Sequence, residues 1–197
     1  MQSYLQDLGD ALLNPRELIA ITRVERRSLT APMVTVFITI SGIIGAFWTP
    51  IHSVIAPYTG VSLSSAISAL IVIGGGFVGV VGWIVLGSVL HAVSRLLGGE
   101  GELEDTLRAL GYSTIGYWIV VPLTLVFSIM GIASSMIGFM AGMILGLIWH
   151  LYSLTQGLSE AQGYSPLRAF ASIIITVLVI IAVAALLSGM VFLLAMV

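Results

Sequence analysis

The chain has 197 residues, of which 58% are hydrophobic and 8% charged, and its formal net charge is -2. Its mean hydropathy is +1.13. Soluble domains carry about 25% charged residues, so this composition excludes a soluble protein and indicates an integral membrane protein. The sequence contains no cysteine, which excludes disulfides, iron–sulfur ligation and thiol catalysis.

The first thirty residues predict two short amphipathic helices. The first has an apolar stripe of Tyr4, Leu5, Leu8 and Leu12, and the second begins at Pro15 with a stripe of Leu18, Ile21 and Val24. Six charged residues flank the second stripe, as is typical of a helix that lies on a membrane surface. A solvated helix that merely precedes a span is the alternative. We expect residues 1–30 to form a cytoplasmic interfacial part and residues 31–197 to form a membrane domain.

Five apolar runs predict five membrane spans. About 20 apolar residues cross a hydrocarbon core of about 30 Å as a helix. The runs cover residues 32–48, 63–97, 114–130, 137–155 and 167–197. The segments between them are expected to be a turn region at Pro50, His52, Pro57 and Gly60, a charged loop, a tight turn at 133–136 and a polar loop at 156–168. The predicted fold is therefore an all-α polytopic bundle.

Charge placement predicts the orientation. With five spans, the N-terminal segment, the second loop and the fourth loop lie on one side of the membrane. They hold all seven arginines and all nine acids of the chain. Because arginine enrichment marks the cytoplasmic side, we expect the N-terminus inside and the C-terminus outside.

The charged loop lies within "SRLLGGEGELEDTLRALGYS", residues 94–113. Residues 102–110 suit a short amphipathic helix started by Gly101, with Leu103, Leu107 and Leu110 pressing on the membrane face. A mobile, solvated hairpin is the alternative.

Small residues recur at helical spacing in two spans. Ser134, Gly138, Gly142 and Gly146 are four residues apart in the fourth span, and the second span carries Gly75, Gly79 and Gly82 on one face. Small residues allow helices in lipid to approach closely. They predict helix packing within the bundle or in a homo-oligomer, and a glycine-lined conduction path is the alternative.

Two histidines fall inside spans, where ionisable groups mark candidate functional sites. His91 lies four residues before Arg95, and His150 lies in "WHLYS". They are either hydrogen-bonded structural residues or a proton-sensitive pair across the bundle. Neither stands at ligand spacing with another His, Asp or Glu, and His52 is isolated, so no metal site is expected.

The sequence also carries no motif of an enzyme. No serine lies in a motif that marks a catalytic nucleophile, and no loop has the residues of a phosphate-binding motif, so no catalytic residue or cofactor is expected. Because the chain has no lysine, we expect no nucleic acid partner.

Three stretches carry a family resemblance. "LLGGEGELEDTLRALGYS", followed by Pro122, resembles the central signature of the Yip family, multi-span proteins named for their interaction with Ypt/Rab GTPases. "LLNPRELI" resembles the entry of prokaryotic members, and "IWHLYSLTQGLSEAQGYSPLRAFA" resembles the tryptophan span and the restart before the last helix. The resemblance implies a prokaryotic-type member in the cell membrane, with five spans and a non-enzymatic role in membrane organisation or trafficking. It points to motif positions that face a partner, namely Gly98, Gly99, Gly111, Tyr112 and Ser113, and further to Trp149, Gly157 and Leu158.

Two functional hypotheses follow. The first is a scaffold or adaptor that self-associates and whose cytoplasmic surface (residues 16–27, 95–108 and 160–168) binds a cytosolic protein or anionic lipid. The second is a transporter or channel for a small solute, proton or lipid that uses His91, His150 and the glycine-lined helices. An intramembrane enzyme is a third, weaker interpretation.

Overall fold

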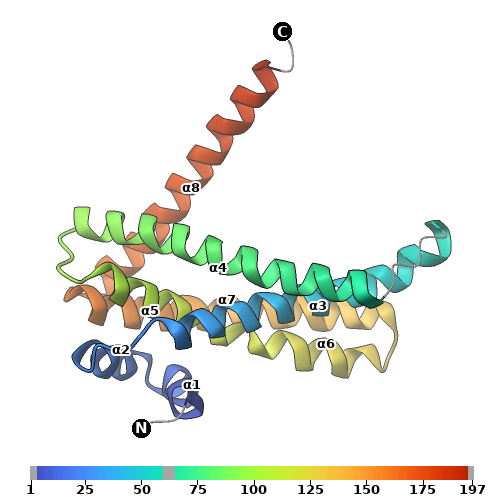
Figure 1. Ribbon diagram of the computed structural model, residues 1–197, viewed down its shortest axis with the longest axis horizontal. Helices are drawn as coiled ribbons and strands as arrows, with labels where there is room; N and C mark the ends of the chain where they lie inside the picture. The colour runs from blue at the N-terminus through green and yellow to red at the C-terminus, as the bar shows by residue number, and fades with distance from the viewer. Residues whose placement is uncertain (1–3, 60–64, 195–197) are drawn as a thin grey trace.

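The computed structural model describes residues 4–59 and 65–194, and these ranges are almost entirely helical (Figure 1). The helices are α1 (Tyr4–Leu13), α2 (Pro15–Val24), α3 (Thr30–Thr59), α4 (Ser65–Leu96), α5 (Leu103–Ser113), the 3₁₀ segment η1 (Thr114–Ile119), α6 (Val120–Ser128), α7 (Ile132–Gln162) and α8 (Pro166–Leu194). Five stretches are long and apolar enough to cross a membrane: Thr30–His52, Ser65–Leu96, Leu103–Ser128, Ile132–Gln162 and Pro166–Val191. The all-α, five-span prediction is confirmed.

The two longest helices extend beyond a bilayer core. α4 has 32 residues and α7 has 31, so at 1.5 Å per residue each is about 45–48 Å long against about 30 Å of hydrocarbon. α1, α2 and α5 gather around one end of these helices (Figure 1). We call this end, made of residues 4–29, 91–113 and 153–169, the charged cap. It contains every arginine, aspartate and glutamate of the chain.

The apolar stripes of α1 and α2 are partly covered by protein. Leu8 and Leu18 are buried in the cap core, whereas Leu5 and Val24 are exposed. α2 packs on the last turns of α7, where Ile19 lies against Gly157. The two short helices are confirmed. The last turns of α7 cover the inner part of the stripe of α2, and contact of the exposed leucines and Val24 with the membrane surface stays a prediction.

The leucines of α5 also pack inward. The predicted amphipathic helix is present and begins after Glu102. Leu107 and Leu110 are buried, and Leu107 fills the space left by Gly87 on α4. The expectation of membrane contact was wrong for Leu107 and Leu110, because the end of α4 covers them. Leu103 is 39% exposed, and its contact with the membrane stays a prediction.

Three predicted turns are helical. α3 continues through Pro50 to Thr59, since a proline in a membrane helix can be accommodated by a local bend. Residues 133–136 belong to α7, and the chain reverses instead at Gly131, whose φ of 111° suits glycine. α7 also runs through most of the predicted polar loop and ends at Gly163, with φ of 69°.

Most of the predicted packing glycines lie at helix contacts. A Cβ at Gly79 would come within 2.7 Å of Ile40 on α3, and a Cβ at Gly75 would come still closer to the end of the Ile44 side chain. On α7, Cβ atoms at Gly138, Gly142 and Gly146 would lie 2.6–2.7 Å from Leu123, Val120 and Tyr117. Gly82 differs, because a Cβ there would meet nothing within 4 Å. A role for Gly82 in self-association stays a prediction.

α8 is packed along its first part only. Ala169, Ser172, Ile173 and Thr176 are buried, and the helix contacts α4 and α7. From Val177 to Val191 every residue is exposed, and the helix leaves the bundle (Figure 1).

Candidate functional site in the charged cap

A buried ion pair lies at the centre of the cap. Arg108 and Asp105, one turn apart on α5, are joined by an Nη1–Oδ1 distance of 2.6 Å, and their side chains are 5% and 2% exposed. Asp105 Oδ2 lies 3.4 Å from Arg23 Nε on α2. Arg108 Nη2 and Nε donate to the carbonyl oxygen of Arg27. The pair therefore ties α5 to α2 and to the turn that follows it.

A second buried group ties the same turn to α1. Arg27 Nη1 lies 2.5 Å from Asp7 Oδ1, and Tyr112 donates from its hydroxyl to Asp7 Oδ2 at 3.4 Å. Burial lowers the pKa of Arg27, but hydrogen bonds and charge attraction from Glu25 and Asp7 outweigh it and raise the pKa above its ordinary value. Arg27 stays charged and holds α1 against α5.

Gln162 joins the loop after α4 to the end of α7. This side chain is 1% exposed, and its Nε2 donates to Thr106 Oγ1 at 2.7 Å. Its Oε1 accepts from the backbone N–H of Gly101, and its backbone carbonyl accepts from Glu100 N. His91 Nδ1 lies 3.1 Å from Thr106 Oγ1. Three chain segments thus meet at one buried amide.

Two clefts open on the surface of this assembly. The α2–α7 cleft, of about 450 Å³, lies between residues 13–20 and residues 152–160. Its edges carry the exposed side chains of Leu13 and Tyr152 and the exposed ion pair of Arg16 with Glu160 at 2.9 Å. The second cleft, of about 390 Å³, is lined by three arginines and three acids: Arg23, Arg26, Arg108, Glu102, Glu104 and Asp105.

The histidines lie in separate environments. His91 contacts Thr106 and Gln162 in the cap. The His150 ring lies 5.4 Å from that of Tyr117, and its buried Nδ1 has no hydrogen-bond partner among the residues that the structure describes. No hydrogen bond or ring contact joins the two histidines within residues 4–59 and 65–194, and Arg95 is exposed. The described part of the chain also holds no cluster of three metal-ligating side chains.

A family comparison bears on the whole assembly. The model of the Yip1 domain matches residues 9–187, which include the second half of α1, all of α2 to α7 and most of α8. The chain belongs to the Yip1 family. No curated protein and no solved structure matches it. Yip1 proteins are integral membrane proteins associated with membrane trafficking, and the match confirms the family expected from the sequence. The expected division of the chain at residue 30 stays a prediction.

The Yip1 motif positions sit mainly inside the cap. Gly99, Gly111, Tyr112 and Ser113 are buried, and Gly98 is exposed. A Cβ at Gly111 would lie 2.6 Å from that of Pro32, and one at Gly99 would collide with Gln162. In the later motif, Gly157 and Leu158 are buried and Trp149 is partly exposed. Contact of these positions with a partner stays a prediction. In this structure Gly99, Gly111 and Gly157 permit close packing inside the cap, and the side chains of Tyr112, Ser113 and Leu158 are buried there.

Four residues that organise the cap could not be singled out from the sequence: Asp7, Arg27, Asp105 and Gln162. Asp105 and Arg108 stand at i, i+3 spacing on an amphipathic helix, which indicates an ion pair but not its burial. Nothing in the sequence marks Gln162, because its partners lie 56 to 71 residues away along the chain.

Proposed function

We propose that this protein is a non-catalytic membrane adaptor whose charged cap faces the cytoplasm and binds a cytosolic protein in the α2–α7 cleft. The observation that carries the proposal is this cleft, in which apolar and charged side chains stand exposed on a framework held by buried ion pairs. The arginine distribution supports the orientation.

The chemistry of the cleft suits a protein partner. Leu13 and Tyr152 are 78% and 49% exposed, and tyrosine and arginine are enriched among residues that dominate binding energy. The Arg16–Glu160 pair is exposed, with side-chain exposures of 63% and 29%. Exposed ion pairs contribute little to stability. Each of the two side chains can therefore leave the pair and bind an oppositely charged group on a partner.

The framework behind the cleft is fixed before binding. α2 is anchored through Leu18 and Ile19, both nearly inaccessible to water, and α7 is anchored through Leu158. A surface that needs no rearrangement loses less entropy when it binds. The cap therefore supports recognition better than it supports the opening and closing of a transport path.

Site-specific photocrosslinking in cells tests the proposal. Tyr152 is replaced by a benzophenone amino acid, and Val85, which is exposed on α4, carries the same group in a control. We expect a discrete protein adduct from position 152, lost in the Arg16→Glu background, and lipid adducts from position 85. Lipid adducts alone from both positions would contradict a protein partner and favour anionic lipid.

A flux measurement addresses the alternative. The purified chain in liposomes is tested for movement of protons, small solutes and labelled lipid, alone and with His91→Ala and His150→Ala together. We expect no flux above that of empty vesicles. Flux that disappears in the double variant would overturn the adaptor in favour of a transporter.

A further inference from the structure

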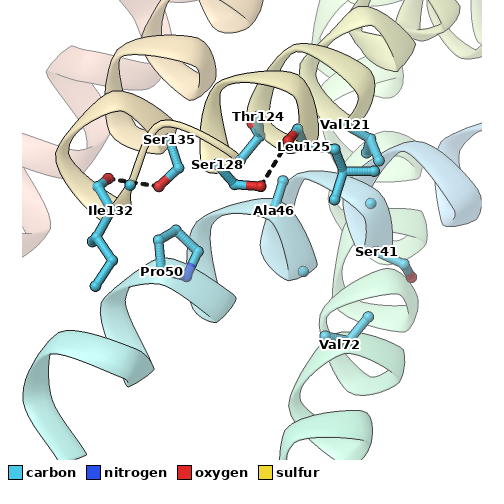
Figure 2. A pocket seen from close by; sticks show the side chains of 13 residues that line it. Ser41, Ala46, Pro50, Val72, Val121, Thr124, Leu125, Ser128, Ile132 and Ser135 are labelled. Atoms are coloured by element: carbon cyan, nitrogen blue, oxygen red, sulfur yellow. Dashed lines mark hydrogen bonds between the residues drawn. The ribbon is translucent and has the colours of Figure 1, made fainter.

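Buried polar side chains gather at both ends of the bundle. At the end away from the cap, a groove of about 590 Å³ lies between α3, α6 and the start of α7 (Figure 2). There Ser128 and Ser135 donate to carbonyl oxygens of their own helices, and the buried hydroxyl of Ser41 has no partner among the residues that the structure describes. Serine hydroxyls do not change charge near neutral pH. The junction at Gln162 in the cap differs, because it contains the imidazole of His91.

One backbone donor fixes the orientation of the Gln162 amide. The N–H of Gly101 can only donate, and it donates to Oε1 of Gln162 at 3.3 Å. The amide nitrogen therefore faces the opposite side, where Nε2 donates to Thr106 Oγ1 at 2.7 Å and lies 3.4 Å from His91 Nδ1. Because Gln162 is 1% exposed, its polar atoms depend on these protein partners rather than on water.

This orientation makes Nδ1 of His91 an acceptor. An amide nitrogen can only donate, so the contact with Gln162 Nε2 requires a lone pair on the ring nitrogen. Thr106 Oγ1 already accepts from Gln162, and its own hydrogen can reach His91 Nδ1 at 3.1 Å, which is closer than the carbonyl oxygen of Glu102 at 3.4 Å. A ring nitrogen that accepts carries no hydrogen, so His91 is neutral here and its proton is on Nε2.

A second proton on the ring reverses these roles. The new N–H at Nδ1 faces the N–H of the Gln162 amide, so donor meets donor. Thr106 must then turn its hydrogen to the more distant carbonyl oxygen of Glu102. One hydrogen of a buried amide is left without an acceptor, which is unfavourable because that group has already lost its contact with water.

The surrounding side chains do not compensate a charge on His91. The charged and titratable groups on the elements around the ring are Arg95 on α4, Glu100 and Glu102 after it, Glu104, Asp105, Arg108 and Tyr112 on α5, Glu160 and Tyr164 at the end of α7, and Arg168 on α8, while α3 carries no arginine or acid. The acids are paired with arginines or exposed. Within residues 4–59 and 65–194, none forms an ion pair with His91, and Arg95 places a like charge beside a protonated ring.

We propose that His91, Thr106 and Gln162 form a pH-sensitive contact that holds residues 99–101 on the end of α7 while His91 is neutral and releases them when it takes up a proton. The N–H groups of Glu100 and Gly101 donate to the backbone and side-chain oxygens of Gln162, so both bonds depend on this residue. The released residues lie in the stretch that carries the Yip signature. Neither His150 nor the α2–α7 cleft takes part, so the inference does not rest on the adaptor function.

Hydrogen–deuterium exchange of the full chain in lipid nanodiscs tests the proposal. Exchange is followed by mass spectrometry at about pH 7.5 and about pH 5, the range in which histidine ordinarily changes charge, and each rate is divided by the intrinsic rate at that pH. We expect the protection of Glu100 and Gly101 to fall about fivefold or more at the lower pH, as for the loss of one hydrogen bond. The amide of Arg27, which donates to Thr22 in the cap, is the internal reference and should keep its protection.

Two asparagine variants separate His91 from other groups that titrate. His91→Asn places an uncharged carbonyl oxygen near the position of Nδ1, so residues 99–101 should stay protected at both pH values. His52→Asn is the matched control, because it removes a histidine from the part of α3 beyond Pro50. This variant should keep the pH response of the unchanged protein.

Three results would overturn the proposal. Constant protection of Glu100 and Gly101 in the unchanged protein would show that protonation does not release the loop. A pH response of His91→Asn equal to that of the unchanged protein would assign it to the acids, and loss of protection that includes Arg27 would mean general unfolding of the cap. If His91→Asn does not fold, as judged by gel filtration, His91→Gln replaces it, and the unchanged protein still decides the first and third results.

Discussion

At the scale of single residues, Asp105 and Arg108 form an ion pair that is almost inaccessible to water. Removing one partner leaves the other charge buried, which typically costs 3–5 kcal/mol. We expect Asp105→Ala to lower the free energy of unfolding by about this amount, as measured by denaturant titration in mixed micelles. Glu104, which also reaches Arg108 but is 61% exposed, provides the control. Its replacement by alanine should cost less than about 1 kcal/mol, and equal losses would contradict the assigned burial.

Gly163 allows a second prediction. Its φ of 69° ends α7, and a Cβ there would meet nothing within 4 Å, so the backbone conformation alone determines the effect of a side chain. Gly163→Ala should destabilise by about 1–2 kcal/mol. Gly9 lies within α1 with equally open space, and Gly9→Ala should stabilise by about 0.5–1 kcal/mol. The same titration measures both, and changes of equal sign would refute the explanation.

The residue scale is also where the sequence is least informative. The arginines and acids of the charged loop could be located from the sequence, and their spacing indicated a helix. The sequence could not show that Asp105 and Gln162 become buried, because burial depends on how far α4 and α7 project past the bilayer. Tyr112 illustrates the same limit. Its motif could be recognised, but its partner Asp7 lies 105 positions earlier.

At the scale of helices, α6 and α7 pack closely because glycines of α7 lie at their contact. A Cβ at Gly142 would lie 2.7 Å from the Cα of Val120, so no rotamer change relieves the clash. We expect Gly142→Leu to abolish the folded species in gel filtration and thermal unfolding. Gly82→Leu makes the same change on an open face of α4 and should leave the fold and its thermal unfolding unchanged. A folded Gly142→Leu variant would show that α6 and α7 pack differently.

The presence of the helices could be predicted from the sequence, but the residues at which they end could not. The five spans and α1, α2 and α5 follow from apolar length and periodicity, which are properties of each segment. Pro50 and residues 133–136 were predicted to be turns and residues 156–168 a polar loop, because proline, glycine and serine favour turns in water. In this protein lipid or the cap surrounds these residues, and the backbone hydrogen bonds of a helix then outweigh the local preference.

At the scale of the whole molecule, the structure and the charge pattern agree on a single charged end. Because the chain has no native cysteine, single cysteines at Arg23, Arg168 and Met130 can be labelled by an impermeant maleimide in intact and opened cells. We expect positions 23 and 168 to react only after opening and position 130, which is exposed at the far turn, to react in both. Reaction of positions 23 and 168 from opposite sides would refute the five-span arrangement.

The contact between Arg16 and Glu160 spans 144 residues of sequence, and this separation matters for biogenesis. A ribosome adds about 5–20 residues per second, so α2 exists for roughly 7 to 30 seconds before the end of α7 is synthesised. During that interval Leu18 and Ile19 have no α7 to cover them. The nascent chain must therefore shelter α2 at the bilayer surface or with a chaperone, and the cap closes only after the end of α7 has been synthesised.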